Sequence, residues 1–190
     1  DVVSVNFIGT RHWTNQWIPR IRTGGAIVTV SSNAAMNYHA RLPLLQEFVA
    51  IEDPAAALDW VKSHSDDVAD GYGFSKEALV VWTQQRGVDL IKKGIRINAT
   101  LPSPTATPMM KDFEVVAGQK ILDIFALPSG RQATASDQAY PLIFLNSPAA
   151  AFISGVCLPV VTTFAHLPSQ VMAQSRLNQA QLRIRLLQAP

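Results

Sequence analysis

The chain has 190 residues, of which 48% are hydrophobic and 16% are charged, and this composition predicts one globular domain with a sizeable core. A formal net charge of +2 gives no electrostatic basis for binding nucleic acid. The most apolar segment, residues 149–161, is shorter than the roughly 20 residues that cross a bilayer, so we expect no membrane partner.

The single cysteine, Cys157, cannot form an internal disulfide, and its apolar neighbours predict a buried thiol. A reducing compartment, the cytoplasm, fits this expectation. No secretory or transit peptide is visible at the amino end. The chain begins at Asp1 instead of methionine, and we therefore expect a processed or partial chain.

The first predicted helix runs from Asn6 to about Arg22, after a short lead from Val2 to Val5. Its expected inner face consists of Phe7, Trp13, Trp17, Ile18 and Ile21. Two glycines end it, and the β-branched stretch Ala26–Val30 then predicts a strand buried on both faces of a parallel sheet.

This strand ends in Ser31 and Ser32. Hydroxyl groups at the carboxyl end of a central strand stand where open α/β sheets bind ligands. Capping of the following turn is the other role open to these serines.

From residue 33 to residue 70 the pattern loosens, and we expect an insertion of two short helices. The first spans about Ala40 to Ile51 and is interrupted by Pro43. The second spans Ala55 to His64, with Asp53-Pro54 as N-cap and first-turn proline. A lid over the substrate and a subunit contact are both open as its function.

The chain is organised around Tyr72-Gly73-Phe74-Ser75-Lys76, at the head of a helical pattern that ends near Lys93. Residues i and i+4 share a helix face, so Tyr72 and Lys76 point into one cleft. A free tyrosine, with a pKa of about 10, is a poor base at neutral pH, and a fixed cation favours its phenolate. Such a tyrosine exchanges a proton with an alcohol or ketone. Taken alone, the pair is also the ordinary pattern of a packed tyrosine beside a solvated lysine.

The apolar residues of this helix are expected to face the sheet: Phe74, Ala78, Val81 and Trp82. The strand that follows, Ile95–Thr100, completes the βαβ pattern of a parallel sheet. A stiff, proline-rich loop at residues 101–108 comes next, and then short helices within residues 110–125.

Residues 134–145 predict a further helix, which opens with a Thr-x-x-Asp box at Thr134 and Asp137. A last strand is predicted at residues 156–161, where Pro159 indicates a sheet edge. The tail, residues 166–190, carries an apolar helical stripe whose members are Ala173, Leu177, Ala180, Ile184 and Leu187. It docks either onto its own domain or onto a partner.

In order and content, these pieces resemble the short-chain dehydrogenase/reductase family from about residue 1 to residue 161. The segments that carry the resemblance are Val5–Phe7, Gly25–Ser32, Tyr72 with Lys76, Gly94–Asn98, Pro102–Met109, Phe144–Ala150 and Ile153–Gly155. The long separation of Ser32 from Tyr72 resembles the branch of coniferyl-alcohol dehydrogenases and bacterial 3-alpha-hydroxysteroid dehydrogenases. The resemblance implies an α/β fold, the carboxy-terminal portion of a Rossmann-like doubly wound parallel sheet with helices on both faces. It divides the chain into a partial NAD(P)-binding domain, residues 1–165, and a helical tail.

The resemblance implies an NAD(P)-dependent oxidoreductase that transfers hydride between a secondary or aromatic alcohol and its carbonyl compound. It places a catalytic tetrad on Asn6, Ser32, Tyr72 and Lys76. Tyr72 would be the acid/base, and Ser32 would hydrogen-bond the reacting oxygen. Lys76 would hold the nicotinamide ribose and favour the phenolate, and Asn6 would support a proton relay through water.

The implied cofactor is NAD or NADP, with NAD slightly preferred, and no metal is expected. The implied cofactor-binding residues are Tyr72, Lys76, Pro102, Ser103, Thr105 and Thr107. The resemblance matches Thr105 and Thr107 to contacts with the nicotinamide carboxamide. The implied partners are a small alcohol or ketone substrate and further copies of the chain, in a homodimer or homotetramer.

Three features depart from the family. The ten glycines form no glycine-rich phosphate loop, so the half of the dinucleotide site that selects NAD or NADP is absent. Ser103 stands where the family usually has glycine, and the last strand runs into Thr162-Thr163-Phe164 in place of Asp-Gly-Gly. A non-catalytic remnant that acts as an oligomerisation partner is therefore the alternative function.

Overall fold

The structure is a computed structural model that describes residues 2–69, 71–108, 110 and 129–162. The chain divides into two compact units, Asp1–Pro102 with Tyr140–Val160 and Ser103–Ala139 with Val161–Pro190. The sheet belongs to the first unit, as do the helices that cover it, except for residues 135–139. The helices predicted within residues 110–125, apart from Met110, and the tail at 166–190 lie outside the described residues.

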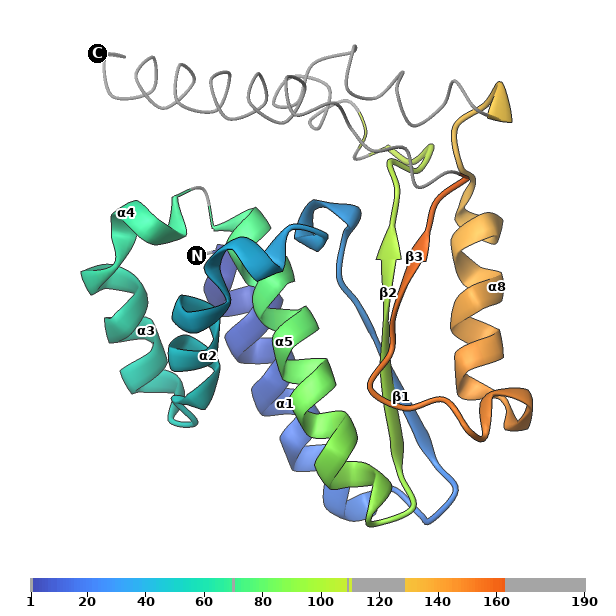
Figure 1. Ribbon diagram of the computed structural model, residues 1–190, viewed down its shortest axis with the longest axis horizontal. Helices are drawn as coiled ribbons and strands as arrows, with labels where there is room; N and C mark the ends of the chain where they lie inside the picture. The colour runs from blue at the N-terminus through green and yellow to red at the C-terminus, as the bar shows by residue number, and fades with distance from the viewer. Residues whose placement is uncertain (1, 70, 109, 111–128, 163–190) are drawn as a thin grey trace. The chain divides into compact units, whose positions relative to one another are not determined.

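The first unit is built on a parallel sheet with the strand order β1-β2-β3. The strands are β1 (Ala26–Val30), β2 (Arg96–Pro102) and β3 (Cys157–Val160). Figure 1 shows helices α1 (Thr10–Trp17) and α5 (Tyr72–Ile91) on one face of the sheet and α8 (Ala135–Asn146) on the other. The predicted Rossmann-like α/β sheet with helices on both faces is confirmed.

The first helix is continuous through three parts: a π-helical segment η1 (Ser4–Gly9), α1, and the 3-10 turn η2 (Ile18–Arg20). Phe7 and Ile18 are buried, as predicted. The prediction is wrong for Trp13 and Trp17, which are 66% and 47% exposed. Trp13 lies more than one and a half turns beyond Phe7, and this places it on the far side of the helix.

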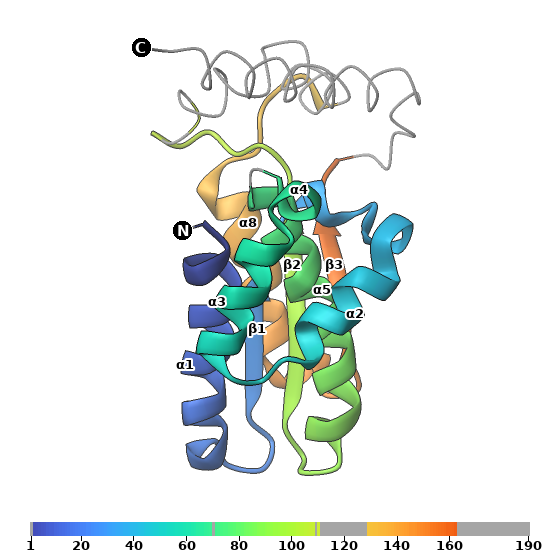
Figure 2. The same cartoon turned by 90° about the vertical axis from the view of Figure 1, so that its left-hand side faces the viewer.

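The insertion folds into several short helices, and those within residues 42–68 lie on the side of α1 and α5 away from the sheet (Figure 2). They are η3 (Asn33–Ala35), η4 (Tyr38–Arg41), α2 (Leu42–Ala50), α3 (Pro54–Ser63) and α4 (Ser65–Val68). Pro43 lies in the first turn of α2 and does not interrupt it, because an N–H group there has no helical partner. The Asp53 carboxylate accepts the Ala56 N–H at 2.8 Å, as its predicted capping role requires.

An aromatic cluster joins the insertion to α5. Phe48 lies at its centre, with ring centroids 5.1 Å from Phe7, 4.9 Å from Trp60 and 5.1 Å from Phe74. The prediction that Phe74 faces the sheet is therefore wrong, because the insertion supplies its aromatic partners. Val80 of α5 packs against the sheet instead, in a second cluster with Ala35 and with Ala99 and Leu101 of β2.

The sheet is held to its helices by two close contacts. A Cβ atom added to Gly87 of α5 would lie 2.6 Å from the Gly155 Cα, so these two backbones touch. On the other face, the buried Arg96 guanidinium donates to the carbonyls of Leu145 at 2.7 Å and Ser147 at 3.1 Å. Arg96 thereby satisfies carbonyl groups at the end of α8 that have no helical partner.

Strand β3 pairs with β2 and, within the described part of the chain, with no further strand, so Pro159 lies in an edge strand as predicted. No helix in the described ranges has the length and apolar character needed to cross a membrane.

Candidate active site

Two segments far apart in the sequence meet at the carboxyl end of β1: the serines that follow the strand and the first turns of α5 (Figure 1). The Ser31 hydroxyl donates to the Lys76 carbonyl at 2.7 Å. The Lys76 ammonium in turn donates to the Val30 carbonyl at 3.0 Å. These two bonds fix the lysine turn of the helix to the end of the strand.

Tyr72 and Lys76 share one face of α5, as their spacing predicts. The Lys76 Nζ atom lies 5.7 Å from the centroid of the Tyr72 ring. Burial lowers the pKa of the Lys76 ammonium, because a low-dielectric environment disfavours its charged form. The same low dielectric strengthens the interaction of this charge with a neighbouring ring or anion.

Asn6 is joined to the same turn through Ser75. The Asn6 side-chain amide donates to the Ser75 hydroxyl at 3.3 Å, and that hydroxyl donates to the Tyr72 carbonyl at 2.7 Å. Asn6 belongs to the π-helical segment η1, and π-helical turns occur frequently at functional sites. Sequence reasoning assigned no role to Ser75, although its place three residues after Tyr72 puts it on the inner side of the helix.

Ser32 is brought to this end of the sheet by β1, and its hydroxyl bonds locally. Its Oγ accepts the Ala34 N–H at 3.1 Å and donates to the Asn33 Oδ1 at 3.4 Å. The structure thus gives Ser32 the capping role that the sequence left open, as the N-cap of η3. Its role toward a reacting oxygen stays a prediction.

The chain enters α5 through an unusual turn. Ala69 has φ 54°, and Gly71, the residue before Tyr72, has φ 77°. A non-glycine residue in such a conformation costs on the order of 1–3 kcal/mol and persists where its surroundings fix it. A Cβ on Gly71 would also lie 3.1 Å from the Val3 side chain, so the positive φ and the tight space both favour glycine there.

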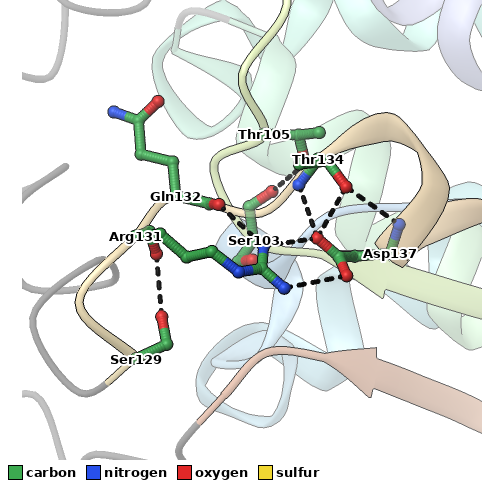
Figure 3. A network of polar contacts seen from close by, with 7 residues as sticks. All are labelled: Ser103, Thr105, Ser129, Arg131, Gln132, Thr134 and Asp137. Carbon is green, nitrogen blue, oxygen red and sulfur yellow. Dashed lines mark hydrogen bonds and ion pairs between the residues drawn. The ribbon is translucent and has the colours of Figure 1, made fainter.

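The predicted cofactor residues beyond β2 belong to the second unit, apart from Pro102, which ends the strand. The Thr105 hydroxyl donates to the Ser103 carbonyl at 2.8 Å (Figure 3), and Thr107 is exposed. Thr105 also pairs with Ala133 in a parallel bridge. Ala69 is the one residue other than glycine with a positive φ in the described ranges. Ser103 therefore has a negative φ and needs no conformation reserved for glycine.

The predicted Thr-x-x-Asp box opens α8 and is confirmed (Figure 3). The Asp137 carboxylate accepts the Thr134 N–H at 2.7 Å, and its own N–H donates to the Thr134 hydroxyl at 3.3 Å. Arg131, which the sequence did not single out, adds a bidentate pair of 2.6 and 3.0 Å. Its guanidinium is the main reason that the pKa of Asp137 lies below its usual range.

The chain is similar in sequence to known dehydrogenases. A family model described as enoyl-(acyl carrier protein) reductase matches residues 61–161. Coniferyl-alcohol dehydrogenase of Pseudomonas sp. strain HR199 is 30% identical over 160 residues, which are 84% of this chain and 63% of that protein. The 3-alpha-hydroxysteroid dehydrogenase/carbonyl reductase of Comamonas testosteroni is 30% identical over 162 residues, 82% of this chain and 62% of that protein.

The fold has a counterpart in the 3-alpha-hydroxysteroid dehydrogenase from Pseudomonas sp. B-0831, solved in complex with NADH. The two structures agree with a TM-score of 0.54 at 28% identity, over 71% of this chain and 53% of that chain. The chain therefore spans less than two thirds of the length of these relatives. With a family model over more than half of its residues and a matching parallel sheet, the chain belongs to the short-chain dehydrogenase/reductase family.

Proposed function

We propose that this chain carries the catalytic residues of an NAD(P)-dependent oxidoreductase that interconverts a secondary or aromatic alcohol and its carbonyl compound. The observation that carries the proposal is the Tyr72–Lys76 pair on one face of α5. The Lys76 ammonium is held 3.0 Å from the Val30 carbonyl, at the carboxyl end of β1. Ligands of open parallel sheets bind at that end.

In the oxidation direction, Tyr72 accepts the proton of the substrate hydroxyl, and in the reduction direction it returns that proton to the carbonyl oxygen. The partly buried Lys76 favours the phenolate form that accepts the proton. Ser32 donates to the reacting oxygen by giving up its 3.4 Å bond to Asn33, a distance at which a hydroxyl bond is weak. The bound nicotinamide supplies the hydride chemistry.

The donor set fits the nicotinamide riboside half of such a cofactor. An ammonium and hydroxyl groups at the carboxyl end of β1 can hydrogen-bond the hydroxyl groups of a ribose, which both donate and accept. Pro102, Ser103, Thr105 and Thr107 complete the proposed cofactor contacts. The NADH complex of the Pseudomonas dehydrogenase supports NAD(P) use, with NAD the first cofactor to test.

Asn6 is proposed to support a proton relay. Its amide is oriented by the buried Ser75 hydroxyl, which also bonds the Tyr72 carbonyl. We further propose that the protein is cytoplasmic and that it forms a homo-oligomer. Apolar side chains exposed along the first helix and α5 support the homo-oligomer: Val5, Trp13, Trp17, Val88 and Ile91.

The first test is cofactor binding, measured by titration with NADH and NADPH. Nicotinamide fluorescence and thermal stability are followed together, because a ligand of the folded state raises stability by mass action. Saturable binding that is weakened in a Lys76→Met variant is expected. A folded protein that binds neither cofactor would contradict the proposed oxidoreductase activity and favour a non-catalytic remnant.

The second test is Tyr72→Phe, which removes the proton-exchanging hydroxyl and keeps the ring. Turnover is expected to fall by at least about a hundredfold with cofactor binding retained. The matched control is Tyr140→Phe, because the Tyr140 side chain is 70% exposed on α8. Turnover that survives Tyr72→Phe would refute the proposed acid/base role.

A further inference from the structure

The turn before Tyr72 needs support from outside itself. Ala69 has φ 54° and ψ −120°, and Gly71 follows in the left-handed region with φ 77°. Conformations of this kind persist where neighbouring contacts over-determine them. Because the turn ends directly at Tyr72, whatever fixes the turn also sets where the tyrosine begins its helix.

Arg41, from the insertion, contacts the chain on both sides of this turn. On the near side, its Nη1 donates to the Asp67 carbonyl at 2.8 Å, two residues before Ala69. On the far side, its Nε donates to the carboxylate of Glu77 in α5. A guanidinium holds its donors in one rigid plane, so it can bind two acceptors in fixed relative positions.

The guanidinium also lies against the first turns of α5. Its Cζ is 5.2 Å from the centroid of the Phe74 ring, a cation–π contact. Its Nη2 lies 4.0 Å from the position of a Cβ on Gly73, the residue after Tyr72. The guanidinium therefore lies at ordinary van der Waals distance from the helix surface at position 73.

Glu77 is a suitable anchor for this contact. It directly follows Lys76, and its side chain is 8% exposed, against 32% for Arg41. A carboxylate that is removed from water is stable when a cation pairs with it. The Glu77 side chain is thus coupled to Arg41 at the helix position next to Lys76.

We propose that Arg41 is a positioning residue for the Tyr72–Lys76 pair, fastening both sides of the strained turn that begins α5. This inference rests on the proposed function for its effect on turnover. The claim that Arg41 holds the residues before Tyr72 in place can be tested without measuring enzyme activity. It assigns the insertion a role in the chemistry beyond the lid and subunit-contact roles that the sequence left open.

The test uses a double variant, Arg41→Met with Glu77→Gln, made in the full chain. Removing both charges keeps the Glu77 carboxylate from losing its Arg41 cation while it stays charged and mostly buried. Arg41→Lys is the conservative variant, because it keeps the charge and loses the planar fork. The control is Lys62→Met, which removes an ion pair with Asp59 in the same insertion whose side chains are 75% and 74% exposed.

Turnover is measured per cofactor-binding site, so that unfolded molecules do not count. The double variant is expected to lose kcat by roughly 10- to 100-fold, with KM for the cofactor within about twofold of the parent. Arg41→Lys is expected to recover part of this loss, and Lys62→Met to behave as the parent. Parental kcat in the double variant, or full recovery by lysine, would overturn the proposal.

Amide hydrogen exchange of Ser75 provides the readout that needs no turnover. Its N–H donates to the Gly71 carbonyl at 2.9 Å and so reports on the turn. Exchange in the double variant is expected to rise at least about tenfold over the parent and over Lys62→Met. If the parent protein shows no dehydrogenase activity, the proposed function fails, and unchanged Ser75 exchange would still overturn the role of Arg41 by itself.

Discussion

The Lys76 ammonium bonds a neutral acceptor, the Val30 carbonyl, at 3.0 Å. A carbonyl orients the ammonium and does not cancel its positive charge, whereas a carboxylate would do both. The charge is thus held in place on the face of α5 that carries Tyr72. The spacing of Tyr72 and Lys76 predicts that they share a helix face. The Val30 carbonyl that holds the lysine lies 46 residues away, and no local pattern predicts this contact.

We expect Lys76→Met to lower turnover and to leave a folded protein whose stability has a different pH dependence. Because burial lowers the pKa of Lys76, the cost of its buried charge is full below that lowered pKa. The cost is relieved as the pH rises toward the ordinary lysine pKa of 10.5, where the unfolded state also releases its proton.

Urea unfolding of both proteins from pH 7 to pH 10.5 measures this relief. The parent should gain stability relative to Lys76→Met as the pH rises. A difference that stays constant over the range would show that the charge at position 76 is not desolvated.

Cys157 is the single thiol, and burial raises its pKa to about 12, against 9.0 for a free thiol. Near pH 8 this lowers the thiolate population by roughly a thousandfold. We expect iodoacetamide to label the folded protein far more slowly than the protein unfolded in urea, as followed by mass spectrometry. Cys157 itself is half-buried, and folded-state labelling within tenfold of the unfolded rate would contradict the raised pKa of its thiol.

At the scale of single elements, the backbone of α5 at Gly87 touches the backbone of Gly155, in the segment that leads into β3. We expect Gly87→Ala to destabilise the fold by about 1–3 kcal/mol, because its Cβ would lie 2.6 Å from the Gly155 Cα and the backbone would have to shift. The measurement is the midpoint of urea unfolding.

Gly73→Ala in the same helix is the matched control, since the nearest heavy atom to its added Cβ is 4.0 Å away. Alanine is the better helix former, so this change should be neutral or stabilising by up to about 1 kcal/mol. Equal effects of the two substitutions would contradict the close approach of Gly87 and Gly155.

The elements that the sequence predicted well are those with local signals. The caps at Asp53 and Thr134 and the start of α5 at Tyr72 depend on residues within one helical turn. The errors at Trp13 and Phe74 concern which face of a helix is covered. That depends on the insertion and on the packing around it, which periodicity along a single helix does not contain.

At the scale of the molecule, the alternation of helix and strand was enough to predict the parallel sheet, because connections between parallel strands need a crossover helix. The site was predictable in part: Asn6, Tyr72 and Lys76 are brought together, while the Ser32 hydroxyl is engaged in a local cap. The contact of Arg41 with Glu77 was not predictable, since nothing in the spacing of two residues in separate helices signals that they meet.

The four tryptophans divide by environment into two optical classes. Trp13 and Trp17 stand at the surface of α1 with ring centroids 5.7 Å apart, whereas Trp60 stacks on His64 and Trp82 is 3% exposed. A water-borne quencher such as iodide should extinguish the red-shifted emission of the first pair before that of the second. The fluorescence of the first pair would thus report on the exposure of α1, and that of the second pair on the packing of the insertion against α5.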